Sequence, residues 1–372
     1  MCLKELHLID SGGLYGAEKM LLTLVARQLG QGLTPMILSA GEPKIAEKPL
    51  ETEARRLGLP VIQWRMKPGL NIVESRRIIQ WAREKDFDLI HTHGFKFNFL
   101  TGILPRSLRK IPQIVTLHGH VPARLLSKIW LYQTVDGFIL PRAERVVIVN
   151  EQMRNLWLIR YLPQSQVTYI PNGIEARSAE KAVLPSRIAG FVKRHSINVV
   201  AVGRLSPEKG FDLLIEALAV HKIELRSIGI CIFGEGGLQA RLQDRIKREG
   251  LEDQIILGGY VSDAGDLLSH FDALVMPSLT EGFPITILEA MRARIPVIAS
   301  SVGGIPNALD YGRCGVLVEP GSVEGLSRGL QELIYCPKRL VSLAKQAQER
   351  FAALFTAEVM ADRYLKVYRA CI

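Results

Sequence analysis

The feature that most constrains this chain is an alternation of short, branched apolar runs with helical patterns, which occurs in two successive series. The apolar runs predict strands near residues 6–9, 35–38, 60–63, 89–92, 113–117, 145–149 and 167–170, and then near residues 198–203, 227–234, 254–259, 272–277, 296–300 and 315–319. Helical periodicity fills the intervals, clearly in residues 74–85. This rhythm is typical of parallel sheets covered by helices. We therefore predict an α/β chain with two doubly wound, Rossmann-like domains.

The segment IPNGIE (170–175) interrupts the rhythm with Pro171 and Gly173. A length of 372 residues also fits two compact domains better than one. We therefore expect domains over residues 1–172 and 173–352, with the C-terminal helix, about residues 353–372, packing back on the first. Because open α/β sheets bind ligands beyond the carboxyl ends of their strands, we expect a site in a cleft where the two domains face each other.

The strongest candidate site is EGFPITILE (281–289), directly after the strand expected at 272–277. Pro284 stands where a helix can begin, so the free backbone N–H groups at the helix start, near Phe283 to Ile285, are suited to a phosphate. Glu281 would accept hydrogen bonds from sugar hydroxyls, and Glu289 from the hydroxyls of a ribose. An acidic residue that complements the helix dipole, together with a surface glutamate, is the alternative, and spacing alone favours it. The position after a strand favours the ligand site. The candidate donor-binding residues here are Glu281, Gly282, Phe283, Pro284, Ile285 and Glu289.

A second candidate is GRLSPEKG (203–210), which also follows an expected strand. Arg204 and Lys209 would bind a diphosphate there, Arg204 as a two-pronged donor and Lys209 as a mobile charge. Gly203 permits close approach of the backbone. The alternative is an exposed turn in which one of the cations pairs with Glu208.

Two glycine-rich loops are weaker candidates. FGEGG (233–237) places Gly234 and Glu235 after a strand, where they would border a nucleotide. Gly12, Gly13 and Gly16 follow the first strand, but their spacing is not that of a dinucleotide fingerprint, so we expect them to bind a phosphate or an acceptor. Simple turn chemistry explains the loop of residues 233–237 equally well.

Histidines gather after two expected strands of the first domain. His118 follows residues 113–117 and would bond a donor-sugar hydroxyl at the reaction centre, although a histidine satisfied by local backbone is the commoner case. His91 and His93 sit similarly after residues 89–90, and His120 lies close by. No helix-spaced pair or adjacent carboxylate supports a metal site, so we expect no metal and no other cofactor.

Charge is unevenly distributed along the chain. Residues 1–172 carry 23 Lys and Arg against 14 Asp and Glu (+9), whereas residues 173–372 carry 24 against 23 (+1). A basic first domain suits an anionic membrane surface or a polyphosphate, as do the basic and aromatic stretches 95–110 and 123–133. Solvated helix faces explain the charge equally well, and burial against the sheet explains the two stretches. No nucleic-acid-binding motif is present.

Composition also bears on location. We find no apolar run of about 18 residues, no basic region ahead of an apolar stretch at the N-terminus, and five scattered cysteines without a CxxC pair. These features predict a cytoplasmic protein, with peripheral attachment to the inner face of the cytoplasmic membrane as a further expectation.

Taken together, the motifs resemble the family-four, or group 1, retaining glycosyltransferases of the GT-B fold. The matching segments are GGLYGAE (12–18), TLHG (116–119), IPNGIE (170–175), GRLSPEKGFDLLIEA (203–217), FGEG (233–236), PSLTEGFPITILEAM (277–291) and PVIASSVGGIP (296–306). The resemblance spans nearly the whole chain.

The resemblance implies a catalytic set of His118, Arg204, Lys209 and Glu281, with the donor held by the second domain and the acceptor by the first. It implies transfer of a sugar from a nucleotide-diphosphate sugar, by default a UDP-sugar, to a glycan or lipid-linked acceptor with retention of configuration. Bacterial cell-envelope polysaccharide or lipopolysaccharide synthesis is the expected setting. A sugar-nucleotide epimerase or hydrolase on the same fold, or a non-catalytic membrane-associated binding protein, is the alternative. Residues 40–70 match no motif, and we expect them to determine the acceptor.

Overall fold

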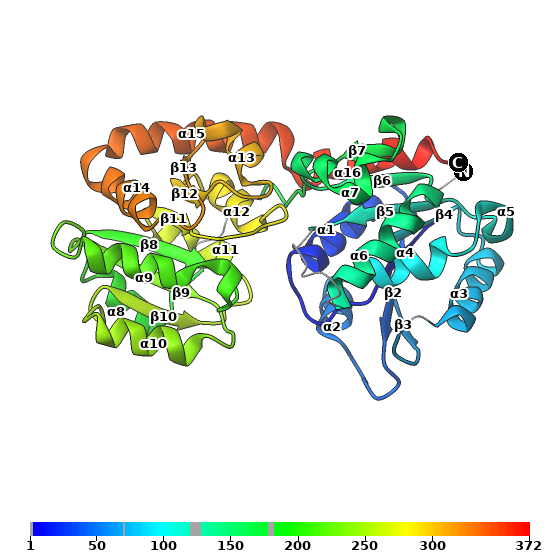
Figure 1. Ribbon diagram of the computed structural model, residues 1–372, viewed down its shortest axis with the longest axis horizontal. Helices are drawn as coiled ribbons and strands as arrows, with labels where there is room; N and C mark the ends of the chain where they lie inside the picture. Colours follow the sequence, from blue (N-terminus) through cyan, green and yellow to red (C-terminus); the bar gives the residue numbers. More distant parts are fainter. Residues whose placement is uncertain (1–2, 70, 120–127, 178–181) are drawn as a thin grey trace. The chain divides into compact units, whose positions relative to one another are not determined.

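A computed structural model describes residues 3–69, 71–119, 128–177 and 182–372. Contacts divide the chain into two compact units. The first contains Met1–Glu175 and Thr356–Ile372, and the second contains Ala176–Phe355. Each unit is an α/β layer structure built on its own parallel sheet (Figure 1).

The first unit has a seven-stranded sheet in the order β3-β2-β1-β4-β5-β6-β7. Its strands are β1 (Glu5–Ile9), β2 (Met36–Gly41), β3 (Val61–Arg65), β4 (Leu89–His93), β5 (Gln113–Leu117), β6 (Arg145–Ile148) and β7 (Val167–Tyr169). Its helices are α1 (Gly16–Gly30), α2 (Pro49–Arg56), α3 (Ile72–Glu84), α4 (Phe95–Gly102), α5 (Arg106–Arg109), α6 (Lys128–Ile139), α7 (Trp157–Arg160) and α16 (Ala357–Arg369). All strand pairs are parallel.

Strand β1 shows why these runs form a covered sheet, because all five of its residues are buried. Leu6 and Leu8 pack into a core that includes Ile78 of α3 and Leu100 of α4. His7 points to the other face, where it meets Gln28 of α1. A strand buried on both faces must be nearly continuous in apolar residues, so a buried histidine in it needs a polar partner.

The second unit has a six-stranded parallel sheet in the order β10-β9-β8-β11-β12-β13. Its strands are β8 (Ile197–Val202), β9 (Ile228–Phe233), β10 (Ile255–Gly259), β11 (Ala273–Met276), β12 (Val297–Ser300) and β13 (Val316–Val318). Its helices are α8 (Ser186–Val192), α9 (Phe211–Val220), α10 (Gln239–Arg248), α11 (Ala264–Leu267), α12 (Ile285–Ala293), α13 (Ile305–Ala308), α14 (Val323–Tyr335) and α15 (Pro337–Leu354). Every strand expected from the sequence is present, with ends that shift by a few residues, and the α/β prediction of two doubly wound sheets is confirmed.

The C-terminal helix α16 packs within the first unit. Its N-cap Thr356 accepts a hydrogen bond from the N–H of Val359 and forms a parallel bridge with Ile174. Gln28 of α1 donates to the hydroxyl of Tyr368 in α16, and Gln31, the C-cap of α1, donates to Asp362 of α16. The cap at Thr356 also explains why the helical pattern of residues 338–370 forms two helices instead of one.

The basic and aromatic stretch 95–110 forms α4 and α5. Phe97 and Leu100 are buried in the core of the unit. Arg109 is fully buried and donates to the Glu144 carboxylate at 2.9 Å and to the carbonyl of Ile111 at 2.8 Å. These contacts favour the buried-helix interpretation of the stretch. Part of the second stretch, residues 123–127, lies outside the described residues. Within the described parts of the chain, no helix combines the length and apolar character that crossing a bilayer requires.

Candidate functional site

In the second unit, the two strongest sequence candidates follow neighbouring strands. Strands β8 and β11 pair directly, and the strand order reverses between them. The loop of residues 203–210 follows β8, and the loop of residues 277–284 follows β11. Both loops therefore lie at the carboxyl edge of the sheet at its topological switch point, where open α/β sheets bind ligands.

A partly buried ion pair joins the two loops. The ammonium of Lys209 lies 2.6 Å from a carboxylate oxygen of Glu281, and that oxygen also accepts from the hydroxyl of Ser278 at 2.7 Å. The N–H of Leu279 donates to the carbonyl of Glu208 at 2.8 Å. Lys209 and Glu281, which are 72 residues apart in sequence, thus belong to one site.

Arg204 is exposed on the same loop as Lys209. Its positive charge affects the pKa of Glu208, which also lies on this loop. Burial disfavours ionisation of Glu208, but hydrogen bonds from the Ser206 hydroxyl and from the backbone, followed by the charges of Arg204 and Lys209, lower its pKa. Two cations therefore gather on the loop after β8, as a diphosphate site requires.

Helix α12 starts directly after the second loop, with Pro284 as its N-cap. Its first N–H groups have no partner within the helix and are suited to an anion. Glu289 lies one turn further on, and its carboxylate packs so closely on Gly265 that a Cβ there would approach its Cδ to 2.4 Å. The roles expected for this helix, a phosphate at its first N–H groups and a ribose at Glu289, stay predictions.

Two close backbone approaches hold the site loops. At Gly234 the φ angle is +145°, and a Cβ would lie 1.9 Å from the carbonyl oxygen of Gly203. Gly303 has a φ of +56°, and its Cβ would lie 2.0 Å from the carbonyl oxygen of Glu281. The neighbouring Gly304 donates its N–H to the carbonyl of Gly282 at 2.7 Å. The segment 303–304 therefore supports the loop that carries Glu281.

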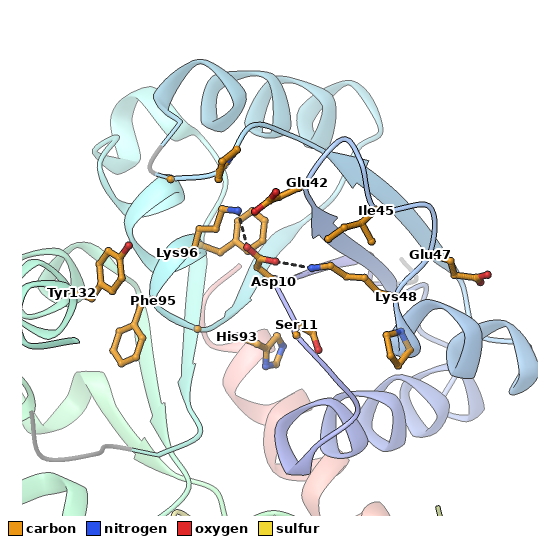
Figure 2. Close-up of a pocket in the computed structure, with 16 residues that line it drawn as sticks. Asp10, Ser11, Glu42, Ile45, Glu47, Lys48, His93, Phe95, Lys96 and Tyr132 are labelled. Carbon is orange, nitrogen blue, oxygen red and sulfur yellow. Dashed lines mark hydrogen bonds and ion pairs between the residues drawn. The ribbon is translucent and has the colours of Figure 1, made fainter. Parts of the chain in front are cut away.

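The first unit contains a cavity of about 660 Å³ at the carboxyl ends of β1 and β4, which is the switch point of its sheet. Asp10 lies at the centre of its polar lining, where one carboxylate oxygen is 2.7 Å from the ammonium of Lys48 and the other is 2.6 Å from that of Lys96 (Figure 2). Burial opposes ionisation of Asp10, but hydrogen bonds from the two lysines hold its pKa below the usual value. Phe95 and Tyr132 are neighbours on another part of the wall.

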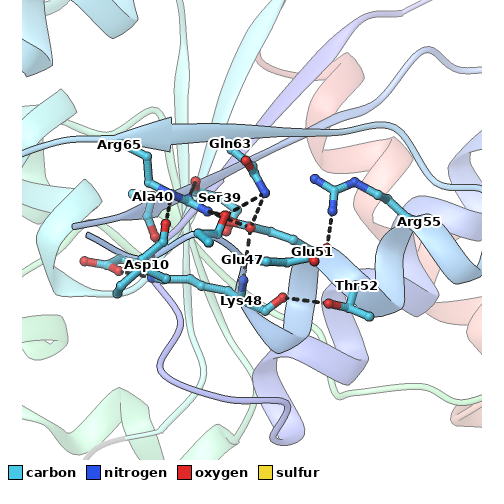
Figure 3. A network of polar contacts seen from close by, with 12 residues as sticks. Asp10, Ser39, Ala40, Glu47, Lys48, Glu51, Thr52, Arg55, Gln63 and Arg65 are labelled. Atoms are coloured by element: carbon cyan, nitrogen blue, oxygen red, sulfur yellow. Dashed lines mark hydrogen bonds and ion pairs between the residues drawn. The ribbon is translucent and has the colours of Figure 1, made fainter. Parts of the chain in front are cut away.

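A second ion pair fixes the wall that carries Lys48 (Figure 3). Glu51 accepts from the guanidinium of Arg65 at 2.8 and 2.7 Å, from the side chain of Gln63 at 2.8 Å, and from the backbone N–H of Lys48 at 3.1 Å. Although burial disfavours the charged carboxylate, hydrogen bonds from Arg65 and from the backbone of Lys48, together with the charge of Arg65, lower the pKa of Glu51 to about 2. The ammonium of Lys48 also donates to the carbonyl of Ala40. Lys48 is thus fixed at both its backbone and its side chain.

The glycine loop after β1 lies beside this cavity. Gly12 lines it together with Ser11. The hydroxyl of Ser11 accepts from the N–H of Gly13 at 3.2 Å, and a Cβ at Gly13 would contact the ring of Tyr15. Gly16 begins α1. The three glycines predicted as a phosphate or acceptor loop therefore lead from the cavity into a helix start.

His118 ends a row of hydrogen-bonded histidines in the first unit. Its Nε2 lies 3.0 Å from Nδ1 of His93, and Nε2 of His93 lies 3.1 Å from Nδ1 of His7. His91 on the same face bonds the hydroxyls of Tyr368 and Thr116, each at 2.7 Å. His93 also lines the cavity.

A metal ion has no ready ligands here, although atoms of His7, His91 and His93 all lie within 4.8 Å of one another. Each ring nitrogen of these three residues already has a hydrogen-bond partner. A metal would have to break these bonds before binding. His120 lies outside the described residues.

Sequence comparison identifies two families along the chain. Residues 15–177 match the profile described as Glycosyltransferase Family 4, and residues 189–350 match the profile described as Glycosyl transferases group 1. The chain belongs to the group 1 glycosyltransferases. It is therefore a sugar transferase that uses a nucleotide sugar, and its resemblance to this family is confirmed.

Relatives of this glycosyltransferase include enzymes of bacterial glycan synthesis. An Escherichia coli UDP-Gal:alpha-D-GlcNAc-diphosphoundecaprenol alpha-1,3-galactosyltransferase is 27% identical over 302 residues, which are 77% of this chain and 76% of the relative. An alpha-D-kanosaminyltransferase of Streptomyces kanamyceticus is 24% identical over 93% of this chain and 97% of the relative. The crystal structure of Anabaena Alr3699/HepE in complex with UDP superimposes with a TM-score of 0.84 at 22% identity, covering 99% of this chain and 100% of that one.

Some site features were not predicted from the sequence. They are the ion pairs of Asp10, the supporting glycines 303 and 304, and the partners of His7 and His93. One signal was available for the histidines: His7 stands between Leu6 and Leu8, and His91 and His93 directly follow Leu89 and Ile90. Partners that are 38 and 86 residues away from Asp10 leave no local signal.

Proposed function

We propose that this glycosyltransferase is a retaining hexosyltransferase that moves the sugar of a UDP-sugar to a glycan or lipid-linked acceptor in bacterial cell-envelope polysaccharide synthesis. The observation that carries the proposal is the ion pair between Lys209 and Glu281, which joins the loops after β8 and β11 beside the start of α12. UDP-galactose is the donor in the name of the E. coli relative, and UDP is bound in the Anabaena structure. Both support a uridine donor.

In this proposal the second unit acts on the leaving group. Arg204, Lys209 and the first N–H groups of α12 stabilise the negative charge that grows on the diphosphate as the bond to the anomeric carbon breaks. These cations supply the positive charge that a metal provides in other transferases, so we propose no metal. Glu289 binds the ribose hydroxyls.

Glu281 contacts the sugar in this scheme but does not attack it. Retention often uses a carboxylate nucleophile. One oxygen of Glu281 is already held by Lys209 and Ser278, which suits a hydrogen-bond acceptor better than a nucleophile. We therefore propose a front-face route. The bond from the anomeric carbon to the diphosphate breaks, the acceptor oxygen bonds to that carbon on the same face, and the acceptor proton passes to a diphosphate oxygen.

The cavity of the first unit is the proposed acceptor site. Its charged lining consists of Asp10, Glu42 and Glu47 against Lys48 and Lys96. Because Asp10 pairs with both lysines, the lining has no surplus of positive charge for a phosphate. Carboxylates and aromatic rings suit the hydroxyls and apolar faces of a sugar. The glycan end of the acceptor, not its diphosphate, is therefore the part we place here.

Titration calorimetry with UDP and a transfer assay together test the donor site. Lys209→Ala should weaken UDP binding by about 10- to 100-fold, because one charge-assisted hydrogen bond contributes about 1.5–3 kcal/mol. Glu281→Gln should leave UDP affinity within about threefold and reduce turnover by about 100-fold, since a carboxylate contact to the sugar is lost while the diphosphate contacts remain. Lys247→Ala, on an exposed position of α10, is the matched control and should behave as the unaltered chain.

Normal UDP binding in Lys209→Ala would contradict the donor-site assignment. Equal losses of binding and turnover in Glu281→Gln would show that Glu281 is structural. Failure of the unaltered chain to bind any nucleotide sugar would favour a non-catalytic binding protein.

A further inference from the structure

The row of histidines in the first unit runs through the interior of the protein in one line. His7 lies in β1, His93 at the end of β4, and His118 just beyond β5. The two inter-histidine distances are 3.1 and 3.0 Å, and the stacked rings of His93 and His118 lie 5.2 Å apart. The line begins at Gln28 of α1, whose side-chain oxygen is 3.0 Å from Nε2 of His7.

Burial keeps these rings neutral. It lowers the pKa of His7 and of His118 to about 4, and that of His93 well below its ordinary value. A neutral imidazole has one N–H donor and one bare acceptor nitrogen. Each ring in the line therefore donates a hydrogen bond from one nitrogen and accepts one at the other. Because the rings bond one another, the donor at one end of the line decides which nitrogen carries the proton in all three.

The Gln28 amide sets that direction. Its NH₂ group donates to the hydroxyl of Tyr368 at 3.1 Å, so its oxygen faces His7 and must receive a proton from Nε2. Nδ1 of His7 then accepts from Nε2–H of His93, and Nδ1 of His93 accepts from Nε2–H of His118. The last ring is left with a bare Nδ1.

A second branch from the same amide agrees with this direction. The hydroxyl of Tyr368 accepts from Gln28 and donates to Nδ1 of His91 at 2.7 Å. His91 then donates from Nε2 to the hydroxyl of Thr116 at 2.7 Å. One glutamine thus fixes the same Nε2–H tautomer in His7, His91, His93 and His118.

The Nδ1 atom of His118, which carries no proton in this scheme, lies at the carboxyl edge of the first unit's sheet. It is buried and has no hydrogen-bond partner among the described residues. His118 follows β5, whose carboxyl end adjoins that of β4, where the cavity lies. A buried acceptor without a partner is costly unless a ligand donates to it.

We propose that Gln28, His7 and His93 are positioning residues that hold His118 in the Nε2–H tautomer, so that its bare Nδ1 accepts a hydrogen bond from a hydroxyl of the sugar. The inference rests on the proposed function only in naming a sugar as the donor of that hydroxyl. Transfer then depends on a glutamine that touches neither substrate, because the opposite tautomer would present an N–H to the same hydroxyl.

Nuclear magnetic resonance tests the tautomers directly in the ligand-free protein. Two-bond proton–nitrogen correlation spectra of the full chain labelled with ¹⁵N-histidine distinguish Nδ1–H from Nε2–H rings. The signals of His118 are those that vanish in His118→Gln. The inference predicts the Nε2–H pattern for His118, and a proton on its Nδ1 would overturn it.

A pair of glutamine variants then tests the positioning role. Gln28→Met removes the amide that sets the direction, so both tautomers of His118 should appear, and kcat/KM should fall about two- to tenfold as the competent fraction drops. Gln31→Met makes the same change between the same two helices, at a glutamine that bonds Asp362, and should leave tautomer and rate unchanged. Full activity in Gln28→Met, or a mixed tautomer in Gln31→Met, would overturn the role. If the unaltered chain transfers no sugar, the proposed function fails, whereas the tautomer spectrum still decides this inference.

Discussion

At the scale of single residues, three buried or partly buried charges of the described chain each have a partner of opposite charge. Lys209 pairs with Glu281, Arg65 with Glu51, and Arg109 with Glu144. Removing Glu144 would leave the fully buried Arg109 without its charged partner, which costs about 3–5 kcal/mol in comparable buried pairs. The ion pair between Lys209 and Glu281 therefore links the two loops of the proposed donor site. It also places the positive charge of Lys209 where we propose that a diphosphate binds.

Glu5 has no such partner among the described residues, and it gives the protein a dependence of stability on pH. Its carboxyl group is fully buried beside the start of the sheet, and neither oxygen has a hydrogen-bond partner within the described residues. Burial raises its pKa from 4.5 to about 8. The folded state therefore holds a proton between pH 4.5 and 8 that the unfolded state releases, so this group stabilises the fold below pH 4.5 and loses that effect as the pH rises to 8.

Glu5→Gln should remove this dependence, because an amide does not titrate. The free energy of unfolding of the variant, relative to the unaltered chain, should rise by about 3 kcal/mol between pH 5 and pH 8, since each pKa unit corresponds to about 1.4 kcal/mol. Urea titrations at the two pH values measure the difference. Glu252→Gln, at an exposed position, should show no such change. A parallel pH profile for Glu5→Gln and the unaltered chain would contradict the buried-carboxyl account.

At the scale of elements, the proposed donor site is made by loops that meet because their strands pair. The loops after β8 and β11 share a switch point, and the loop after β12 supports the second of them through Gly303 and Gly304. None of the three loops forms the site alone. The geometry of Glu281 thus depends on residues more than 20 positions later in the chain.

Gly303→Ala tests this support. The new Cβ would lie 2.0 Å from the carbonyl oxygen of Glu281, so the loop must move, and we expect transfer to fall at least about tenfold with a loss of stability of about 1–3 kcal/mol. Gly250→Ala is the control, because Gly250 has a similar φ of +61° but its Cβ would meet only the flexible end of Lys222. Its stability should fall through backbone strain while its rate stays normal. Equal rates in the two variants, measured under conditions where both are folded, would contradict the supporting role of Gly303.

The sequence predicted elements better than it predicted contacts. All thirteen strands of the described residues could be located from the sequence, because apolar runs and turn residues are local signals. The motif around Glu281 indicated a ligand site, but its pairing with Lys209 depends on which strands lie side by side. The histidines of β1 and β4 suggested at most a metal, because Gln28, the partner of His7, and Tyr368, the partner of His91, come from distant helices. Spacing along one strand cannot reveal those partners.

At the scale of the whole molecule, each unit has a candidate site at the switch point of its sheet, and the two sites differ in their chemistry. The second unit presents cations and a helix start at its switch point, as a leaving diphosphate requires. The first presents a cavity in which Asp10 balances two lysines, as a neutral glycan requires. Much of the cavity wall comes from residues between 42 and 69. They lie within the region 40–70, which matches no family motif and which we expected to determine the acceptor.

Release of UDP from a UDP-sugar, followed with and without a lipid-linked N-acetylglucosamine diphosphate as acceptor, tests the account most directly. The account predicts that UDP appears only when an acceptor is present, in step with a new glycosidic bond whose anomeric configuration is that of the donor. UDP release at the same rate without any acceptor, or a product of inverted configuration, would contradict it.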